Sequence, residues 1–518
     1  MENFYSKLQN TQNNVSVTEN GMIGYKTTSH ALLDFNFKVA SYRNSLEQGV
    51  EDFKEVLKEK DTYVLKYLMY LRDAREGVGE RDLFRVCLKL FLESNVENKD
   101  SIVDVIVKTT PEYGRFDDLF VLFDTKYEQV VVDFIRKQIR VDCLAYKNGE
   151  PISLLAKWLP SENASSKKTR KLARHLMGKL EIEPKKYRQI LSTLRSYLNV
   201  VEVKTCAGCW QEIDYNEVPS KANLKYQDAF LRHDETRRRE FLSKALAGDE
   251  SVKVNMGVAF PHEIVHKYGH RFGRKYDQSL EAYWKNLKPC VGLQDTIVVR
   301  DGSGSMWSTI GNTSIHALEV STALAIYCSQ FLRGAFKDKF ITFSSKAQLV
   351  DLSSCGSLDS KLRKTEDYDD CSNTNIENVF NLILNTAINN QMKQEDIPST
   401  VLIISDMEFD CCANVEDNVF VNMSAKFKAH GYELPKLVFW NVNSRTMTIP
   451  CHFNSKGVLL ISGFSQNVLS MVMNGKTDPY EALVEELSKE RYSQVPLVTF
   501  STITKTNKKE NVDISTFL

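Results

Sequence analysis

Several features of membrane-bound, secreted and catalytic proteins are missing from this 518-residue chain. It contains no apolar run of about 18 residues, the length that a membrane-spanning helix needs. The N-terminus, MENFYSKLQNTQNN, is polar and lacks the apolar core of a signal peptide. The eleven cysteines form no dense, regularly spaced framework, so we expect reduced thiols. These absences predict a cytoplasmic protein without a membrane span.

Recognisable catalytic signatures are also scarce. The sequence has no Walker loop, no GxSxG elbow and no kinase signature. Cys206 and Cys209 form a single CxxC without a second pair, which favours structural thiols over a metal or redox site. We therefore expect a protein that is not an enzyme.

One motif supports the opposite hypothesis. His262, Glu263 and His266 fit the HExxH pattern, in which two histidines on one helix hold zinc and the glutamate activates water. Pro261 places His262 in the first helical turn, and no third ligand is obvious, although Glu281 could serve. A zinc metallopeptidase is therefore kept as a third hypothesis.

The zero net charge hides an uneven distribution. Residues 1–150 carry 21 basic and 25 acidic side chains, residues 151–290 carry 26 and 16, and residues 291–518 carry 20 and 26. The middle segment therefore has a net charge of +10 between two acidic flanks. Such a segment can bind phosphate, or it can be a solvated helical face that balances its neighbours.

The apolar pattern divides the chain near residue 290. From about Ala31 to Cys290, apolar residues recur at helical spacing, as in TYVLKYLMYLRDA and LFRVCLKLFL, with short Gly- and Pro-containing breaks. Many helices with short connections predict stacked antiparallel helix pairs. After Pro289, strand-like runs such as DTIVVRD, TVLIISDMEF and KLVFWNV alternate with helical stretches, which predicts an α/β Rossmann-like sheet.

A motif that suits a divalent cation follows the first of these strands. Asp301, Ser303 and Ser305 occupy alternate positions in DGSGS, where glycines permit a tight turn. Thr374, in SNTNIENVF, and Asp406, after VLIIS, should reach the same sheet edge, with Ser372 as an alternative to Thr374. Mg²⁺ and Mn²⁺ both prefer such oxygen ligands.

These positions resemble the von Willebrand A family with an intact metal-ion-dependent adhesion site. The resemblance implies that Asp301, Ser303, Ser305, Thr374 and Asp406 hold the metal. It also implies that an acidic group of a protein partner fills the open coordination position, so the site would bind and not catalyse.

The whole chain resembles the Ro autoantigen family, within a related group of uncharacterised proteins. The residues that carry this resemblance lie in LRDAREGVGERDLF, PEYGRFDDLF and LAKWLPSE: Arg72, Asp73, Arg75, Gly77, Gly79, Glu80, Arg81, Gly114, Arg115, Asp117, Asp118, Trp158 and Pro160. We interpret Arg72, Arg75 and Arg115 as structural. The resemblance implies a HEAT-like helical TROVE module that binds small structured or misfolded RNA, joined to a von Willebrand A domain.

The predicted division is a flexible arm at 1–28, a HEAT-like (TROVE-like) helical domain at 29–290, a von Willebrand A-like domain at 291–500 and a polar tail at 501–518. Clustered cations in the helical domain are the candidate RNA-binding residues, because cations neutralise phosphates. They are Lys167, Lys168, Arg170, Lys171, Arg174, Lys185, Lys186, Arg188, Arg237, Arg238, Arg239, Arg271, Arg274 and Lys275.

The leading hypothesis is a non-enzymatic, ribonucleoprotein-type RNA-binding protein of the Ro kind, with a magnesium-dependent site for a protein partner. The alternative is a protein-interaction scaffold without nucleic acid. The position of the basic residues separates the two hypotheses, because a shared surface favours RNA and scattered, paired cations favour the scaffold.

Overall fold

The computed structural model describes residues 12–269, 274–289, 293, 295–411, 419–473 and 475–501. The chain forms two compact units that interleave along the sequence. The sheet unit contains residues 1–61, 76–78 and 256–489, and the helical unit contains residues 62–75, 79–255 and 490–518. None of the described helices is long and apolar enough to cross a membrane.

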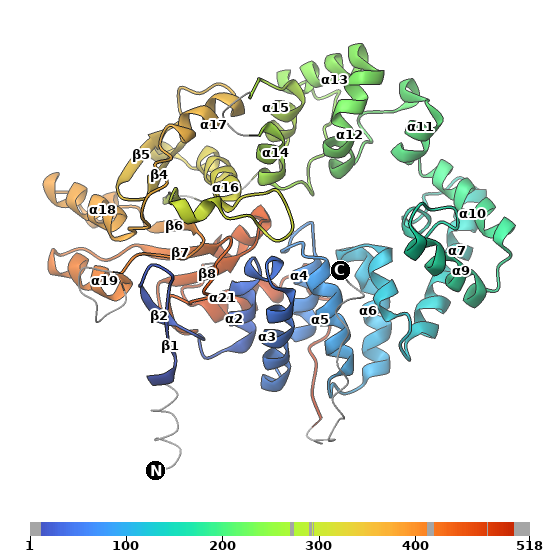
Figure 1. Ribbon diagram of the computed structural model, residues 1–518, viewed down its shortest axis with the longest axis horizontal. Helices are drawn as coiled ribbons and strands as arrows, with labels where there is room; N and C mark the ends of the chain where they lie inside the picture. The colour runs from blue at the N-terminus through green and yellow to red at the C-terminus, as the bar shows by residue number, and fades with distance from the viewer. Residues whose placement is uncertain are drawn as a thin grey trace. The chain divides into compact units, whose positions relative to one another are not determined.

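The sheet unit is built on a six-stranded mixed sheet of order β5-β4-β3-β6-β7-β8 (Figure 1). All neighbouring strands are parallel except β4 and β5, which pair antiparallel at one edge. The strands are β3 (Thr296–Asp301), β4 (Lys339–Phe343), β5 (Ala347–Asp351), β6 (Thr400–Ser405), β7 (Lys436–Asn441) and β8 (Val458–Ser462). This arrangement confirms the predicted α/β sheet.

Helices cover the sheet because its central strands are apolar on both faces. Every residue of β3 is buried, as are all residues of β6 and β7 except the first. The helices of this unit are α2 (Ala31–Lys38), α3 (Leu46–Glu59), α14 (Pro261–Tyr268), α15 (Gln278–Lys285), α16 (Ala317–Phe331), α17 (Leu358–Glu366), α18 (Glu377–Asn389), α19 (Val419–Ala429), α20 (Ser470–Met473) and α21 (Pro479–Leu487). Helix α16 packs on β3, β4 and β6, and α2 and α21 pack on β8 (Figure 1).

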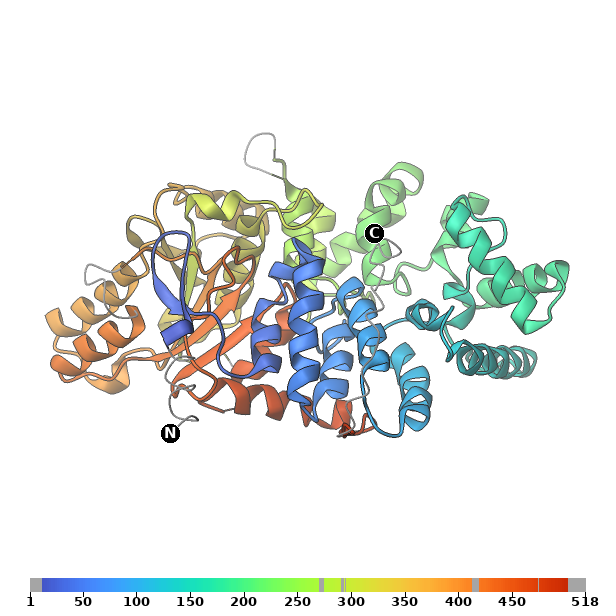
Figure 2. The same cartoon turned by 60° about the horizontal axis from the view of Figure 1, so that its bottom comes forward.

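The helical unit consists of helices that pack on their neighbours in sequence. They are α4 (Val64–Arg72), α5 (Asp82–Glu93), α6 (Lys99–Tyr113), α7 (Glu128–Asn148), α8 (Leu155–Trp158), α9 (Lys167–Leu180), α10 (Pro184–Tyr197), α11 (Val201–Ala207), α12 (Ser220–His233) and α13 (Glu235–Ala247). Helix α7 packs against α6, α9 and α10, and α12 packs against α13 (Figure 2). The predicted helical region is therefore confirmed, with boundaries that differ from those expected.

Two boundaries are corrected by the structure. Helices α2, α3, α14 and α15, which were assigned to a helical domain at 29–290, belong to the sheet unit. Conversely, residues 490–501 belong to the helical unit, where Ser501 N donates to Asn95 O at 2.9 Å. The rest of the predicted tail lies outside the described residues.

The described part of the predicted flexible arm is an ordered β-hairpin. Strand β1 (Val15–Val17) pairs antiparallel with β2 (Ile23–Tyr25) (Figure 2). Tyr25 exchanges two backbone hydrogen bonds of 2.8 Å with Ile449. A Cβ atom on Gly24 would lie 2.6 Å from Thr448 Cγ2 and 2.8 Å from Ile449 O. Glycine is therefore required for this close approach. Residues 1–11 of the arm lie outside the described residues.

We predict that Gly24→Ala loosens the hairpin from residues 448–449, because the added methyl overlaps a backbone oxygen. Overpacking of this kind costs about 1–3 kcal/mol, so the Tyr25 and Ile449 amides should exchange roughly ten- to a hundredfold faster. Gly356→Ala is the matched control, since a Cβ there would meet no atom within 4 Å. Hydrogen exchange measured by mass spectrometry tests this, and unchanged protection in Gly24→Ala contradicts it.

Candidate functional site

The candidate site lies at the carboxyl ends of β3 and β6, where the strand order of the sheet reverses. Strand β3 connects onward to β4 on one side, and β6 lies on its other side. Because β3 and β6 are parallel, with Arg300 opposite Ile404, their carboxyl ends place Asp301 beside Ser405 and Asp406. Ligand sites of doubly wound sheets form at such a position.

The loop after β3 is shaped by the Asp301 carboxylate. Ser303 N donates to Asp301 Oδ1 at 2.9 Å, and Ser405 Oγ donates to Asp301 Oδ2 at 2.6 Å. The Ser303 and Ser305 hydroxyl oxygens lie 3.0 Å apart. Gly304 allows the loop to press on a neighbouring segment, since a Cβ there would lie 2.9 Å from Cys371 O. The loop oxygens are therefore held close together.

Thr374 and Ser372, the two candidates for one hydroxyl ligand of the metal, lie in different surroundings. Thr374 is buried, and its Oγ1 accepts a hydrogen bond of 3.3 Å from Asn20 Nδ2. Ser372 is exposed; its Oγ donates to Asp370 Oδ1 at 2.9 Å and accepts from Ser345 N at 3.1 Å. Thr374, not Ser372, thus faces the protein interior.

Burial places Asp301 and Asp406 under electrostatic strain. Both residues are 0% exposed. Burial raises the pKa of Asp301, and burial together with the Asp301 charge raises the pKa of Asp406 to about 7. Asp406 Oδ2 accepts no hydrogen bond among the described residues, and the Arg445 guanidinium lies 3.8 Å from it. Asp406 therefore has a long ion pair with Arg445 but no hydrogen bond to this oxygen among the described residues.

The chemistry of this set suits a hard divalent cation. Two carboxylates and three hydroxyls supply only oxygen atoms, which Mg²⁺ and Mn²⁺ prefer. A cation beside Asp406 Oδ2 would neutralise the two buried charges and satisfy the oxygen that accepts no hydrogen bond. The residues that could hold it are Asp301, Ser303, Ser305, Thr374 and Asp406.

A third buried carboxylate, that of Glu408, organises the surroundings of the site, and the sequence did not reveal it. Glu408 is 0% exposed, and its oxygens accept hydrogen bonds from the backbone nitrogens of Glu19, Arg445 and Thr446 at 2.8–2.9 Å. Asn20 Nδ2 also donates to Glu408 O at 2.6 Å. The acidic spacing in DMEFD was a possible signal, but the donors come from distant segments.

The HExxH residues have structural partners. Glu263 Oε2 accepts from Phe260 N at 3.0 Å and caps α14, while the His262 ring packs near the Phe464 ring. The His266 nitrogens lie 3.0 Å from Glu319 Oε2 and 3.1 Å from Ser314 Oγ. Glu281 Oε2 accepts from Leu358 N at 2.8 Å. In the structure, Glu263 thus caps α14, and His262, His266 and Glu281 contact residues of neighbouring segments.

The candidate RNA-binding residues divide into exposed and buried groups. Exposed side chains on α9 and α10 are Lys167, Lys168, Lys171, Arg174, Lys185, Lys186 and Arg188, of which Arg188 pairs with Glu162. Arg170 is partly buried and donates to Ala164 O and Ser165 O at 2.7 Å. The first predicted cluster therefore lies largely at the surface.

In the second cluster, the structure corrects the prediction for Arg238. Arg238 is 0% exposed, donates to Asn223 Oδ1 at 3.0 Å and lies 4.6 Å from the Tyr215 ring centroid, so it cannot reach RNA. Arg237 donates to Asp234 Oδ2 at 2.8 Å, and Arg239 pairs with Glu235 at 2.7 Å.

Arg274 is buried against Glu366, Lys275 is exposed, and Arg271 lies outside the described residues. Arg72, Arg75 and Arg115 are structural as predicted, with Arg72 Nε 2.8 Å from Asp118 Oδ2.

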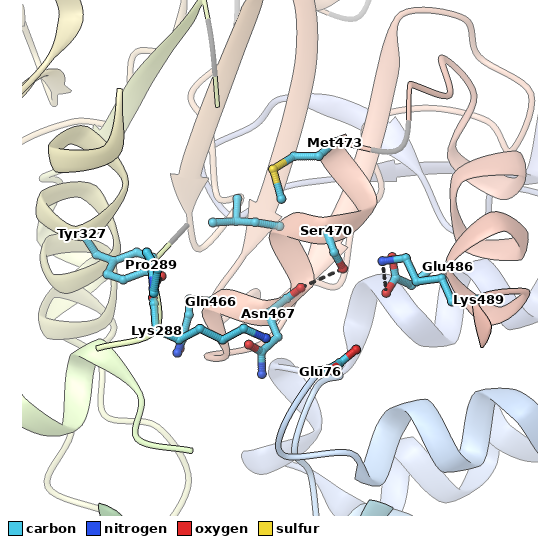
Figure 3. A pocket seen from close by; sticks show the side chains of 11 residues that line it. Glu76, Lys288, Pro289, Tyr327, Gln466, Asn467, Ser470, Met473, Glu486 and Lys489 are labelled. Atoms are coloured by element: carbon cyan, nitrogen blue, oxygen red, sulfur yellow. Dashed lines mark hydrogen bonds and ion pairs between the residues drawn. The ribbon is translucent and has the colours of Figure 1, made fainter. Parts of the chain in front are cut away.

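A small cavity of about 110 Å³ occurs elsewhere in the sheet unit. Its lining includes Lys288, Gln466, Asn467 and the ion pair between Glu486 and Lys489, whose atoms lie 2.7 Å apart (Figure 3). None of the candidate metal ligands lines it. Its lining mixes polar and apolar side chains, and its size suits water or a small ion.

Comparisons with known proteins extend over most of the chain without naming an activity. Residues 295–516 match a family described as a domain of unknown function (DUF7788), and residues 178–291 match another (DUF2828). The chain is 28% identical over 502 residues to uncharacterized protein L728 of Acanthamoeba polyphaga mimivirus, covering 89% of this chain and 85% of the relative. It is also similar to the crystal structure of the Deinococcus radiodurans RO (RSR) protein, with a TM-score of 0.42, 12% identity, and coverage of 89% and 94% of the two chains.

We predict that Asp406→Asn stabilises the protein in the absence of divalent cations. A carboxyl whose pKa rises from 3.8 to about 7 on folding destabilises the folded state progressively as pH rises between these values. The stability gained by Asp406→Asn should therefore approach roughly 2–4 kcal/mol at pH 8 and vanish near pH 4.

Urea denaturation in EDTA at pH 5, 6.5 and 8 measures this effect. Glu395→Gln, at an exposed position, is the charge-matched control and should leave stability unchanged at every pH. A loss of stability in Asp406→Asn at pH 8 would show that the pair is not electrostatically strained.

Proposed function

We propose that the strand-end site binds a divalent cation, Mg²⁺ or Mn²⁺, through Asp301, Ser303, Ser305, Thr374 and Asp406, and that an acidic group of a protein partner completes the coordination. The observation that carries this proposal is the pair of fully buried carboxylates with an Asp406 oxygen that accepts no hydrogen bond from the described residues. Burying two adjacent negative charges is costly unless a cation or proton neutralises them.

The role of each residue follows from its contacts. Asp301 is fixed by Ser405 Oγ and Ser303 N, so its carboxylate is oriented before a cation arrives. Ser303 and Ser305 supply neutral oxygens that contribute ligands without adding repulsion. Thr374 is oriented by Asn20. The carboxylates and hydroxyls thus serve as ligands, and the proposed activity is binding, not catalysis.

The proposed location is the cytoplasm. Every described cysteine is a free thiol, which agrees with a reducing compartment.

We predict that Ser303→Ala weakens the binding of Mn²⁺ by the whole chain. Wild-type protein should be stabilised by about 2.7 kcal/mol at a Mn²⁺ concentration of 100 times the dissociation constant. Ser372→Ala is the matched control, because this exposed hydroxyl was the alternative ligand and bonds Asp370 instead. Isothermal titration calorimetry and thermal unfolding with Mn²⁺ measure both effects. Equal losses in the two variants, or no Mn²⁺ binding by the wild type, would refute the proposed site.

A second proposed activity, RNA binding of the Ro type, belongs to the helical unit. Residues 133–197 contain 15 basic and six acidic side chains, a net charge of +9. Helices α7, α9 and α10 pack together, and their exposed side chains include Lys137, Arg140, Lys171, Arg174, Lys185 and Lys186. A concentration of cations on packed helices is typical of phosphate recognition. We propose that small structured or misfolded RNA binds here, and not at Arg237–Arg239.

We predict that replacing Lys171, Lys185 and Lys186 with Gln weakens RNA binding and reduces its salt dependence. Each lost phosphate contact lowers the slope of log affinity against log salt by about 0.7 for single strands. Replacing Lys221, Lys225 and Lys253 of the same unit removes the same charge from exposed positions outside this surface. Filter binding of a structured RNA with a single-stranded end, at several salt concentrations, distinguishes the two variants. Equal effects would mean that only net charge matters.

The scaffold without nucleic acid remains the alternative. It is favoured by the burial of Arg238 and Arg274 and by the ion pair of Arg237 with Asp234, which make these three side chains less available to RNA. It predicts that wild-type protein shows no measurable binding of the RNA in the same assay.

A further inference from the structure

Glu19 and Arg445, neither of which is a candidate metal ligand, form an ion pair at the edge of the candidate metal site. Arg445 follows β7, and its guanidinium pairs with the Glu19 carboxylate and lies 3.8 Å from Asp406 Oδ2. The Arg445 side chain is 34% exposed and that of Glu19 is 57% exposed. Arg445 is therefore open to solvent while standing next to a buried candidate ligand.

The backbone nitrogens of Glu19 and Arg445 both donate to the carboxylate of Glu408. Glu408 Oε2 accepts from Glu19 N at 2.9 Å, and Glu408 Oε1 accepts from Arg445 N at 2.8 Å. Thr18 Oγ1 also donates to Phe409 O at 2.6 Å, which fixes the hairpin turn. The turn is anchored, so the Glu19 side chain can leave Arg445 without any movement of the backbone.

We propose that Arg445 is a second anion-binding group of this site, and that Glu19 is an intramolecular carboxylate that occupies it until an acidic side chain of a protein partner displaces Glu19. This inference rests on the proposed function of the divalent cation. A partner carboxylate would then interact with the cation and with the Arg445 guanidinium.

The weakness of the exposed Glu19–Arg445 ion pair supports the replacement of Glu19 by another carboxylate. An ion pair between exposed side chains is weak in water, because solvent screens the attraction and both side chains lose freedom. Guanidinium groups bind carboxylates through directed, charge-assisted hydrogen bonds. Another carboxylate that approaches the cation therefore replaces Glu19 at little cost and gains the same contact.

A substitution at Glu19 or Arg445 is expected to change the affinity for Mn²⁺ and the affinity for a partner carboxylate in opposite directions. Arg445 repels a cation near Asp406, and Glu19 offsets that repulsion. Glu19→Gln should therefore strengthen carboxylate binding while weakening Mn²⁺ binding. Arg445→Gln should do the reverse. A pair that only ties the hairpin to the loop after β7 would not produce these opposed signs.

The test is titration of Mn²⁺-loaded full-length protein with acetate, followed by the longitudinal relaxation of water protons. Acetate that displaces a water molecule from Mn²⁺ lowers the relaxation rate. Mn²⁺ affinity is measured separately for each variant, so that every sample is saturated. Glu51→Gln breaks an exposed ion pair with Lys54 in the same unit and is the matched control.

The half-saturating acetate concentration should fall roughly fivefold in Glu19→Gln and rise roughly fivefold in Arg445→Gln, the scale of an exposed ion pair. In the Arg445→Gln background, adding Glu19→Gln should have no further effect on acetate. Glu51→Gln should match the wild type.

Unchanged acetate binding in both single variants, or changes of the same sign, would overturn the inference while leaving the cation site intact. Failure of wild-type protein to bind Mn²⁺, or relaxation that is unaffected by Asp301→Asn, would overturn the proposed function and this inference together.

Discussion

The burial of the Asp301 and Asp406 carboxylates next to each other is the constraint on which the candidate site depends. Parallel pairing of β3 and β6 fixes the two residues side by side, where water cannot screen their charges. The surrounding segments supply hydroxyls or hydrogen-bond donors, but the Asp406 oxygen stays without a hydrogen bond among the described residues. Such a pair lowers the free energy of unfolding of the cation-free protein, and a bound cation would raise it again.

Glu408 explains how distant segments are assembled around this pair. Its buried carboxylate bonds backbone nitrogens of the N-terminal hairpin and of the loop after β7, which are separated by more than 400 residues of sequence. The same hairpin orients Thr374 through Asn20. The site therefore depends on both ends of the sheet unit, and a change in the hairpin is expected to reach the candidate ligands.

The sequence was informative where the determining contacts are local. DGSGS places three candidate ligands in one turn, and the apolar runs of β3, β6, β7 and β8 mark buried strands. Strand β5 was missed because AQLVD is short, has no long apolar run and is buried at Val350 alone. The hairpin was missed because its polar residues resemble a loose arm, and its partners at 406–411 and 448–449 cannot be read from nearby sequence. Three consecutive arginines suggest a charged surface, yet successive helical residues point about 100° apart, so Arg238 faces Tyr215, Phe230 and Phe241 in the core.

The central claim is that a divalent cation neutralises the buried pair. Anomalous diffraction from a crystal soaked in Mn²⁺, with data collected on the high-energy side of the manganese edge, tests it most directly. The account predicts one strong peak bounded by oxygens of Asp301, Ser303, Ser305, Thr374 and Asp406, at the octahedral distances of about 2.0–2.2 Å for direct ligands. The absence of a peak there, with Asp406 Oδ2 hydrogen-bonded to a water molecule, would contradict it.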